Sequence, residues 1–153
     1  MSFLSFIYEK RVYVIIYIVI LCILITQIKI IYVSSESIPY RYCLQIYNIQ
    51  PKKGCLCAIE VDGKTIVKYI SGVEGDYVHS VSLSNGIYMY VNNHKIGRVI
   101  HNENVSILPN VIIPTNKVFV SGTHAYSFDS RYKEFGLIDK SKLNGLVLGL
   151  LKW

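Results

Sequence analysis

Lys68 is the residue of this chain whose surroundings most favour chemistry. It lies in an apolar segment, TIVKYIS (residues 65–71), which leads into a glycine-rich turn, GVEGD. An ammonium group is costly to bury, and burial lowers the pKa of a lysine until its neutral amine can accept a proton. Such an amine can activate a serine hydroxyl as a nucleophile, whereas a strand lysine more often extends along the surface to water.

A serine cluster, SSESIP (residues 34–39), supplies the candidate partner hydroxyls. Ser37 precedes Lys68 by 31 residues (68 minus 37). Pro39 favours an extended backbone before it, which would present Ser37 in a cleft, although serines near a proline are commonly turn residues. The chain has no G-x-S-x-G motif and no histidine–aspartate pair flanking a serine. A serine–lysine dyad is therefore the nucleophilic chemistry that these residue types allow.

The segment before these serines is typical of a membrane anchor. Residues 12–25 carry no charge, and the apolar character continues to Val33 with three polar interruptions. As a helix, residues 12–33 would be long enough to span roughly 30 Å of hydrocarbon if Lys29 extends to the interface. A cleaved signal peptide is the alternative, but no small-x-small cleavage motif follows. We therefore predict a transmembrane helix over residues 12–33.

The charges around this segment predict its orientation. Lys10 and Arg11 lie just before it, so residues 1–11 should stay in the cytoplasm and residues 34–153 should be exported. The chain is then expected to be a single-pass plasma-membrane protein with a periplasmic or extracytoplasmic domain, and the lipid bilayer is an expected partner. A net charge of +6 could suggest nucleic acid, but the sequence has no basic cluster interleaved with aromatic residues, so we expect no nucleic-acid partner.

The exported part has the pattern of a mainly β, antiparallel domain. Short runs rich in Ile, Val, Tyr and Thr alternate with turn signals, and Asp62-Gly63 and Asn85-Gly86 predict two hairpins with type I′ turns. Residues 102–116 lack clear periodicity and are expected to form a surface connection. The runs KVFVSG (residues 117–122) and NGLVLGLLKW (residues 144–153) are expected to be later strands, the second of them too short to span a membrane.

The cysteines and histidines give weaker signals. Cys43, Cys55 and Cys57 would lie on the exported side, and if a disulfide exists we expect Cys43 to pair with Cys55 or Cys57. The four histidines show no zinc-ligand spacing with these thiols, so we expect no metal and no organic cofactor.

Three segments, in order, resemble the conserved boxes of the type I signal peptidases. SESIP resembles the nucleophile box S-x-S-M-x-P or S-M-P, and IVKYISGVEGD resembles the lysine box [IV]-K-R-[IV]-x-G-x-P-G-D. VFVSGTHAYSFDSRYKEFG resembles V-F-V-x-G-D-x-x-x-x-S-x-D-S-R-Y-x-G, and this third match is the most specific. The boxes and the preceding apolar segment cover most of the chain. The resemblance implies a signal-peptidase-like antiparallel β-fold after one transmembrane helix, and a serine endopeptidase activity.

Position by position, the resemblance also implies roles for the polar residues. Ser37 would be the acylating nucleophile, and Lys68 the general base that later protonates the leaving amine. The amide of Ser37 and the hydroxyl of Ser35 would form the oxyanion hole, and Ser127 would orient the Lys68 amine.

Four further residues would support the site. Asp129 and Arg131 would form a structural ion pair, and Gly122 and Gly136 would meet backbone requirements.

The sequence departs from the family pattern at several positions beside the chemistry. Ile38 replaces a Met, which is a tolerable apolar exchange. Tyr69 stands where an Arg is usual, Glu74 where a Pro is common, and Thr123 where an Asp follows the Gly.

Within the superfamily, the short chain, the close serine-to-lysine spacing and SGTHAYSFDSRY are most similar to the conjugative-transfer (TraF-type) signal peptidases, although Arg41 occupies the Gly position of that group's S-M-P-x-G box. Those enzymes process exported pilin subunits of type IV secretion systems. The expected partner is therefore an exported precursor, a pilin or another signal-peptide-bearing protein. Two alternatives remain open: a general housekeeping signal peptidase, and a non-catalytic membrane-anchored β-domain that acts as a scaffold.

Overall fold

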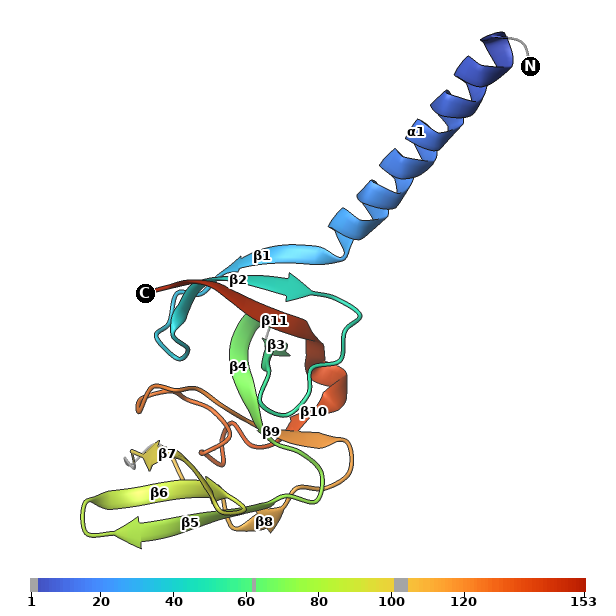
Figure 1. Ribbon diagram of the computed structural model, residues 1–153. Coiled ribbons are helices and arrows are strands. Elements are labelled where there is room, and N and C mark those ends of the chain that lie inside the picture. The colour runs from blue at the N-terminus through green and yellow to red at the C-terminus, as the bar shows by residue number, and fades with distance from the viewer. Residues whose placement is uncertain (1–2, 62, 101–104) are drawn as a thin grey trace.

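One N-terminal helix precedes strands that form two antiparallel sheets, as the computed structural model shows (Figure 1). The structure describes residues 3–61, 63–100 and 105–153. Its elements in chain order are α1 (Phe3–Thr26), β1 (Ile28–Tyr32), β2 (Tyr40–Ile46), β3 (Leu56–Val61), β4 (Lys64–Gly72), β5 (Tyr77–Leu83), β6 (Gly86–Val91), β7 (His94–Val99), β8 (Val111–Ile112), β9 (Lys117–Ser121), β10 (Ile138–Asp139), a short 3₁₀ helix η1 (Lys140–Lys142) and β11 (Leu143–Lys152).

The predicted helix over residues 12–33 is wrong in its last third. Helix α1 ends at Thr26, whose hydroxyl donates to the Ile23 carbonyl, and Ile28–Tyr32 form strand β1. The β-branched run IKIIY pairs in register with β2 and buries Ile31 in the core, which a continuing helix would not do. In the part of the chain that the structure describes, no helix combines the length and hydropathy that a bilayer crossing requires.

The larger sheet has seven strands in the order β1-β2-β11-β3-β4-β9-β10. Strand β1 is therefore an edge strand. Strand β4 pairs with β3 along Lys64–Tyr69, but its pairing with β9 begins only at Tyr69. On the side opposite β3, the first half of β4 therefore has no strand partner, so it forms a further free edge of the sheet. Both free edges lie in the region of the candidate site.

The smaller sheet, in the order β7-β6-β5-β8, lies at the far end of the molecule from α1 (Figure 1). Its apolar inner face packs into a core cluster with Val78, Met89 and Phe119, the last of which comes from β9 of the larger sheet.

Both predicted hairpins are present, since β3 pairs with β4 and β5 with β6. Asp62 of the first predicted turn lies outside the described residues, and the second turn differs from its prediction. In the β5–β6 hairpin Leu83 pairs with Gly86, so the loop is Ser84-Asn85, and Gly86 is the first residue of β6. Positive φ occurs at Gly86 (+136°) and not at Asn85, which excludes a type I′ turn. Gly86 lies against the Arg98 side chain, so a Cβ there would be 2.7 Å from Arg98 Nε.

The expected surface connection over residues 102–116 contains one short strand, β8, which extends the smaller sheet at β5. Residues 102–104 of that prediction lie outside the described residues. The expected strands over residues 117–122 and 144–153 are confirmed as β9 and β11.

No disulfide joins Cys43 to Cys55 or Cys57, because all four cysteines are free thiols. Cys43 packs in the core cluster that contains Ala58 and Val67, whereas Cys57 packs in the cluster that contains Ile59 and Ile70. Burial raises the pKa of Cys43, and it raises the pKa of Cys57 to about 12. Separate core packing, rather than a covalent bond, holds these residues.

Candidate active site

Lys68 is buried in strand β4, as the burial hypothesis requires. Only 4 % of its surface is exposed, and its Nζ donates a hydrogen bond of 2.6 Å to Ser127 Oγ. Burial lowers the pKa of Lys68 from 10.5 to about 8; the negative charge of Asp129 opposes this shift, and the positive charge of Arg131 adds to it. A substantial fraction of the amine is therefore neutral at mildly alkaline pH.

Ser37 lies in the loop between β1 and β2, and two of the chain's later segments hold that loop in place. The Ser37 carbonyl accepts a hydrogen bond of 2.7 Å from the Thr123 amide, and the Ile38 carbonyl accepts one of 3.1 Å from Trp153 Nε1. Ile38 itself is fully buried, so the apolar residue after Ser37 anchors the loop in the core.

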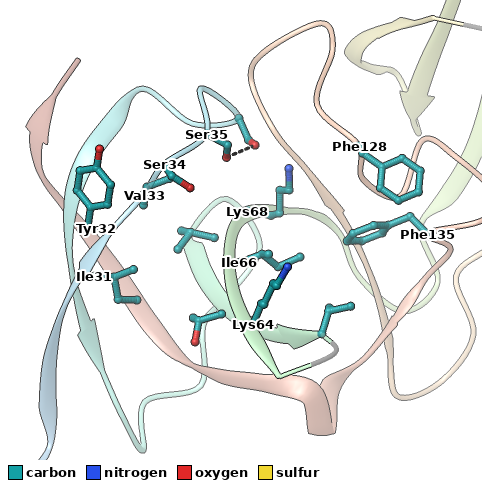
Figure 2. A pocket seen from close by; sticks show the side chains of 14 residues that line it. Ile31, Tyr32, Val33, Ser34, Ser35, Lys64, Ile66, Lys68, Phe128 and Phe135 are labelled. Carbon is teal, nitrogen blue, oxygen red and sulfur yellow. Dashed lines mark hydrogen bonds between the residues drawn. The ribbon is translucent and has the colours of Figure 1, made fainter.

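The hydroxyls of Ser35 and Ser37 are 2.8 Å apart and hydrogen-bonded to each other. In Figure 2, where the dashed line marks this bond, the Lys68 amine points toward the same side of the pocket as Ser35. Among the described residues no hydrogen bond joins Ser37 Oγ to Lys68 Nζ, whose amine is bonded to Ser127 instead. The structure thus brings both members of the predicted dyad to one pocket without a direct bond between them.

That pocket has a volume of about 450 Å³. One wall comes from the end of β1 and the serine loop, and the opposite wall from β4, with Phe128 and Phe135 closing a further side (Figure 2). Its lining residues are Ile31, Tyr32, Val33, Ser34, Ser35, Ser37, Val61, Lys64, Thr65, Ile66, Val67, Lys68, Phe128 and Phe135. The two walls contain the free edges of β1 and of the first half of β4.

Gly122 lies between Ser127 and the loop that carries Ser37. A Cβ at this position would be 2.3 Å from Ser127 Oγ and 2.5 Å from the Ser37 carbonyl oxygen. Because neither close contact can form without displacing one of these groups, glycine is the residue that fits. The requirement arises from close approach and not from a positive φ.

Asp129 and Arg131 form a buried ion pair directly behind the site. Arg131 Nε donates to Asp129 Oδ1 at 2.8 Å, and the other Asp129 oxygen accepts from the Gly122 amide at 2.8 Å. The guanidinium also donates to the carbonyls of Arg98, His124 and Ser127. The pair therefore joins the Gly122 turn, the Ser127 loop and strand β7 into one unit.

The predicted site residues consequently lie together. Ser35, Ser37 and Lys68 line the pocket, Ser127 is bonded to Lys68, and Gly122 packs against Ser37 and Ser127. Asp129 and Arg131 lie behind these groups and bond to the Gly122 amide and the Ser127 carbonyl. Gly136 lies farther along the chain, with φ +68° and its amide bonded to the Tyr132 carbonyl.

Sequence reasoning missed three contributors to the site. Phe128 and Phe135 form an aromatic wall, and Trp153 fixes the serine loop. Nothing in their spacing along the chain indicates these contacts. For Thr123, which departs from the family's Asp, the backbone amide donates to the Ser37 carbonyl at 2.7 Å, and the side-chain hydroxyl adds a longer contact of 3.4 Å to the same oxygen.

Comparison with known proteins assigns the chain to a class. Residues 7–151 match the family model described as signal peptidase, peptidase S26, which is a family of serine endopeptidases. Since this match covers nearly the whole chain, the chain belongs to that family, and the membership supports signal-peptide cleavage as its activity.

Solved structures give a more distant likeness. A crystal structure of a signal peptidase I from Enterococcus faecalis V583 matches with 19 % sequence identity and a TM-score of 0.43, covering 63 % of this chain and 95 % of that one. No curated protein matches the chain significantly.

Proposed function

We propose that this chain is a membrane-anchored serine endopeptidase that cleaves leader peptides from exported precursors, with Ser37 as the nucleophile and Lys68 as the general base. The observation that carries the proposal is the state of Lys68. Its amine is buried in a pocket shared with Ser37, its hydrogen-bond acceptor is a neutral hydroxyl, and its pKa is lowered to about 8. A lysine in this state can exchange protons near neutral pH.

The Ser35–Ser37 hydrogen bond defines the first step of the mechanism. Rotation of the Ser37 side chain would move Oγ away from Ser35 and toward Lys68 Nζ, which keeps its bond to Ser127. The same rotation frees the Ser35 hydroxyl for the oxyanion hole. Hydrogen bonds of this kind are often incomplete before substrate binds.

The chemistry then follows from these positions. Lys68 accepts the proton of Ser37 as Oγ attacks the scissile carbonyl, and the Ser37 amide and the Ser35 hydroxyl stabilise the oxyanion. Protonated Lys68 gives its proton to the leaving amine, which leaves an acyl-enzyme. Water, deprotonated by Lys68, hydrolyses that ester and regenerates Ser37.

The free edges of β1 and β4 favour a substrate bound as an extended strand between them. Each edge offers unpaired backbone groups, and the pocket between the edges is bounded by Ile31, Val33 and Ile66. Small side chains are expected next to the cut, because the fixed walls of such a pocket exclude larger ones.

Helix α1 supports a location at the plasma membrane. Its apolar side chains from Val12 to Ile25 are exposed, and Lys10 and Arg11 directly precede this apolar run within the helix. We place the N-terminus in the cytoplasm and the peptidase domain outside it. The anchor would raise the effective concentration of the site where precursors emerge.

The natural substrate that we propose is a pilin precursor in conjugative transfer or type IV secretion, on the strength of the TraF-like motif spacing. A general housekeeping signal peptidase is the alternative substrate range. The missing direct bond between Ser37 and Lys68 is the observation that favours a non-catalytic scaffold, and the lowered pKa of Lys68 is the observation against it.

The test is cleavage of a membrane-reconstituted pilin precursor and of a generic secretory precursor by wild type, Ser37→Ala and Lys68→Ala. The matched control is Lys117→Ala, which removes a partly exposed lysine of β9 that is paired with Asp139. We expect wild type and the control to cut, and both dyad variants to remain folded and inactive. The precursor that is cut assigns the substrate range. If wild type cuts neither precursor, or Ser37→Ala cuts as well as wild type, the scaffold function replaces the peptidase.

A further inference from the structure

A second pocket, with a volume of about 370 Å³, lies where the larger and the smaller sheet meet. Its walls are the end of β4, residues 121–123 at the end of β9, residues 94–96 of β7 and residues 53–54 before β3. We call it the junction pocket. Thr123, which lines it, donates its amide to the Ser37 carbonyl at 2.7 Å. The junction pocket is therefore connected to the loop that carries the nucleophile.

Two departures from the family pattern lie together in the junction pocket. Tyr69 stands where the lysine box usually has an Arg, and Thr123 stands where an Asp usually follows the glycine of the third box. Both residues line this pocket, although they are far apart in the sequence. The usual pattern would place a cation and an anion here, whereas this chain has two uncharged hydroxyl groups. The exchange removes a carboxylate that would repel an anionic ligand.

The remaining polar groups of the lining are hydroxyls and basic side chains, and the lining contains no Asp or Glu. Ser121 is only 5 % exposed, and its hydroxyl is hydrogen-bonded to that of Ser71 at 2.6 Å. Lys53 is already paired with Asp76, which lies outside the lining, at 2.7 Å. Lys95 is exposed, and it forms no ion pair with a carboxylate in the part of the chain that the structure describes.

Lys95 is therefore the cation of this pocket that is available to an anion. Its ammonium lies 3.6 Å from the centre of the Tyr88 ring, a contact that orients the side chain and leaves its charge in place. Tyr69 and His94 line the same pocket, and each can donate a hydrogen bond. A cation with neighbouring hydrogen-bond donors suits a carboxylate, which accepts hydrogen bonds at both oxygens.

Strand pairing indicates which part of a substrate reaches this pocket. The edge of β4 is free only up to Lys68, because from Tyr69 onward β9 occupies it, starting at Ser121. Under the proposed function the leader lies along the free edge, so the edge ends at the position of the cut. The segment on the carboxyl side of the cut must then leave the sheet across residues 121–123, which line the junction pocket.

We propose that the junction pocket binds an acidic side chain of the precursor, from the segment on the carboxyl side of the cut, with Lys95 as the cation and with Tyr69 and His94 as hydrogen-bond donors. The inference rests on the proposed function, since it assigns a second binding site to the same substrate. It also explains the two departures. Tyr69 and Thr123 permit a preference for an acidic side chain that an Asp at the second position would oppose.

The test uses the full chain in vesicles and leader-peptide substrates that differ in one side chain. Glu, or its neutral isostere Gln, is placed in turn at each of roughly the first four positions after the cut, which span about 13 Å when extended. At one position, or at adjacent ones, kcat/KM for the Glu substrate should exceed that for the Gln substrate by about fivefold or more. This Glu-to-Gln ratio should fall as sodium chloride is added, because salt screens the exposed Lys95.

Charge variants locate the preference. Lys95→Gln should bring the Glu-to-Gln ratio close to unity, and Lys95→Glu should invert it. Thr123→Asp, which restores the family's carboxylate, should also lower the ratio. The matched control is Lys142→Glu, which makes the same charge change at an exposed lysine of η1 outside both pockets. Its ratio should stay within about twofold of wild type, since exposed charges at a distance are screened. Circular dichroism would show that each variant is folded.

Three results would overturn the inference, and they separate it from the proposed function. Equal cleavage of the Glu and Gln substrates at every position would exclude the acidic preference, while the cleavage itself upholds the peptidase. A preference that persists in both Lys95 variants, or that Lys142→Glu reduces equally, would assign the effect to the net charge of +6 and not to the junction pocket. No cleavage of any substrate by wild type would refute the proposed function and the inference with it. Because each ratio compares two substrates on one variant, a general loss of rate does not imitate the expected result.

Discussion

Strand β4 and the segment from Gly122 to Arg131 each bury one cation beside the same pocket, and the two cations are treated in opposite ways. Arg131, 1 % exposed, donates to both oxygens of Asp129 and to three backbone carbonyls. Lys68, 4 % exposed, donates to a single side-chain oxygen, Ser127 Oγ, in the described structure. Both side chains are almost completely buried, but only Arg131 has a carboxylate in contact.

This difference in hydrogen-bond partners gives Arg131 and Lys68 different roles. A buried charge that has a partner and hydrogen bonds stays charged and holds its surroundings together. A buried amine without a carboxylate in contact loses stability in its charged form, so its pKa falls. The first arrangement makes Arg131 structural, and the second suits Lys68 to proton transfer under the proposed function.

The largest expected loss of stability comes from removing Arg131, the cation of the buried ion pair. Arg131→Met would leave the fully buried Asp129 without its partner, which should lower the free energy of unfolding by about 3–5 kcal/mol. Urea denaturation at neutral pH measures this loss. The control is Lys117→Met at the solvent-accessible Lys117–Asp139 pair, where the loss should be much smaller because solvent screens the pair. Similar losses in both variants would contradict the structural role of Arg131.

Lys68→Met, at the cation that has no carboxylate in contact, should raise the free energy of unfolding instead of lowering it. The pKa of Lys68 falls from 10.5 to about 8 on folding. Below pH 8 the folded protein therefore carries a charged, buried Lys68 at a cost of about 3 kcal/mol. Lys68→Met should recover up to that amount of stability, and it should abolish cleavage. Between pH 8 and 10.5 the unfolded wild type binds more protons than the folded form, so wild-type stability rises and the gain of the variant should fade. Thermal unfolding of both proteins across this range is the measurement. A variant that is less stable than wild type at pH 7 would show that the lysine is well paired.

A substitution at Gly122 tests how closely the serine loop packs against Ser127. Gly122→Ala would press its methyl group against Ser127 Oγ and the Ser37 carbonyl, which should cost about 1–3 kcal/mol of stability and slow cleavage. Gly136→Ala is the comparison, because its φ of +68° makes the alanine strained while its nearest contact, at 3.5 Å, is ordinary. Gly136→Ala should therefore lose stability without a change in the cleavage rate. Unaltered cleavage in Gly122→Ala would contradict the close packing of the serine loop on this turn.

The smallest expected effect is the pH dependence of cleavage. With the pKa of Lys68 at about 8, the neutral fraction of the amine rises about tenfold per pH unit below that value, and kcat should rise with it and level off above pH 8. Initial rates with a leader-peptide substrate from about pH 6 to 9 measure the profile. A rate that keeps rising toward pH 10 would mean that Lys68 titrates like an exposed lysine.

Much of the fold was predictable because its signals are local. Alternating β-branched and aromatic residues predicted most of the strands, and turn dipeptides predicted the hairpins, although the β5–β6 loop lies one residue earlier than Asn85-Gly86 indicates. The start of β1 was not predictable in this way. Its run IKIIY continues the apolar character of α1, and only pairing with β2 determines that it is a strand.

By itself, the sequence determined that a lysine lies in an apolar strand, that serines precede a proline, and that three motifs occur in the order of a signal peptidase. These are properties of neighbouring residues, so a linear pattern contains them. The tertiary structure alone decided what surrounds the lysine. The Thr123 amide reaches the Ser37 carbonyl, Ser127 reaches Lys68, and Trp153 reaches Ile38, across separations of 86, 59 and 115 residues. The energy of a buried charge depends on every group that packs around it, and packing across such separations has no counterpart in local spacing.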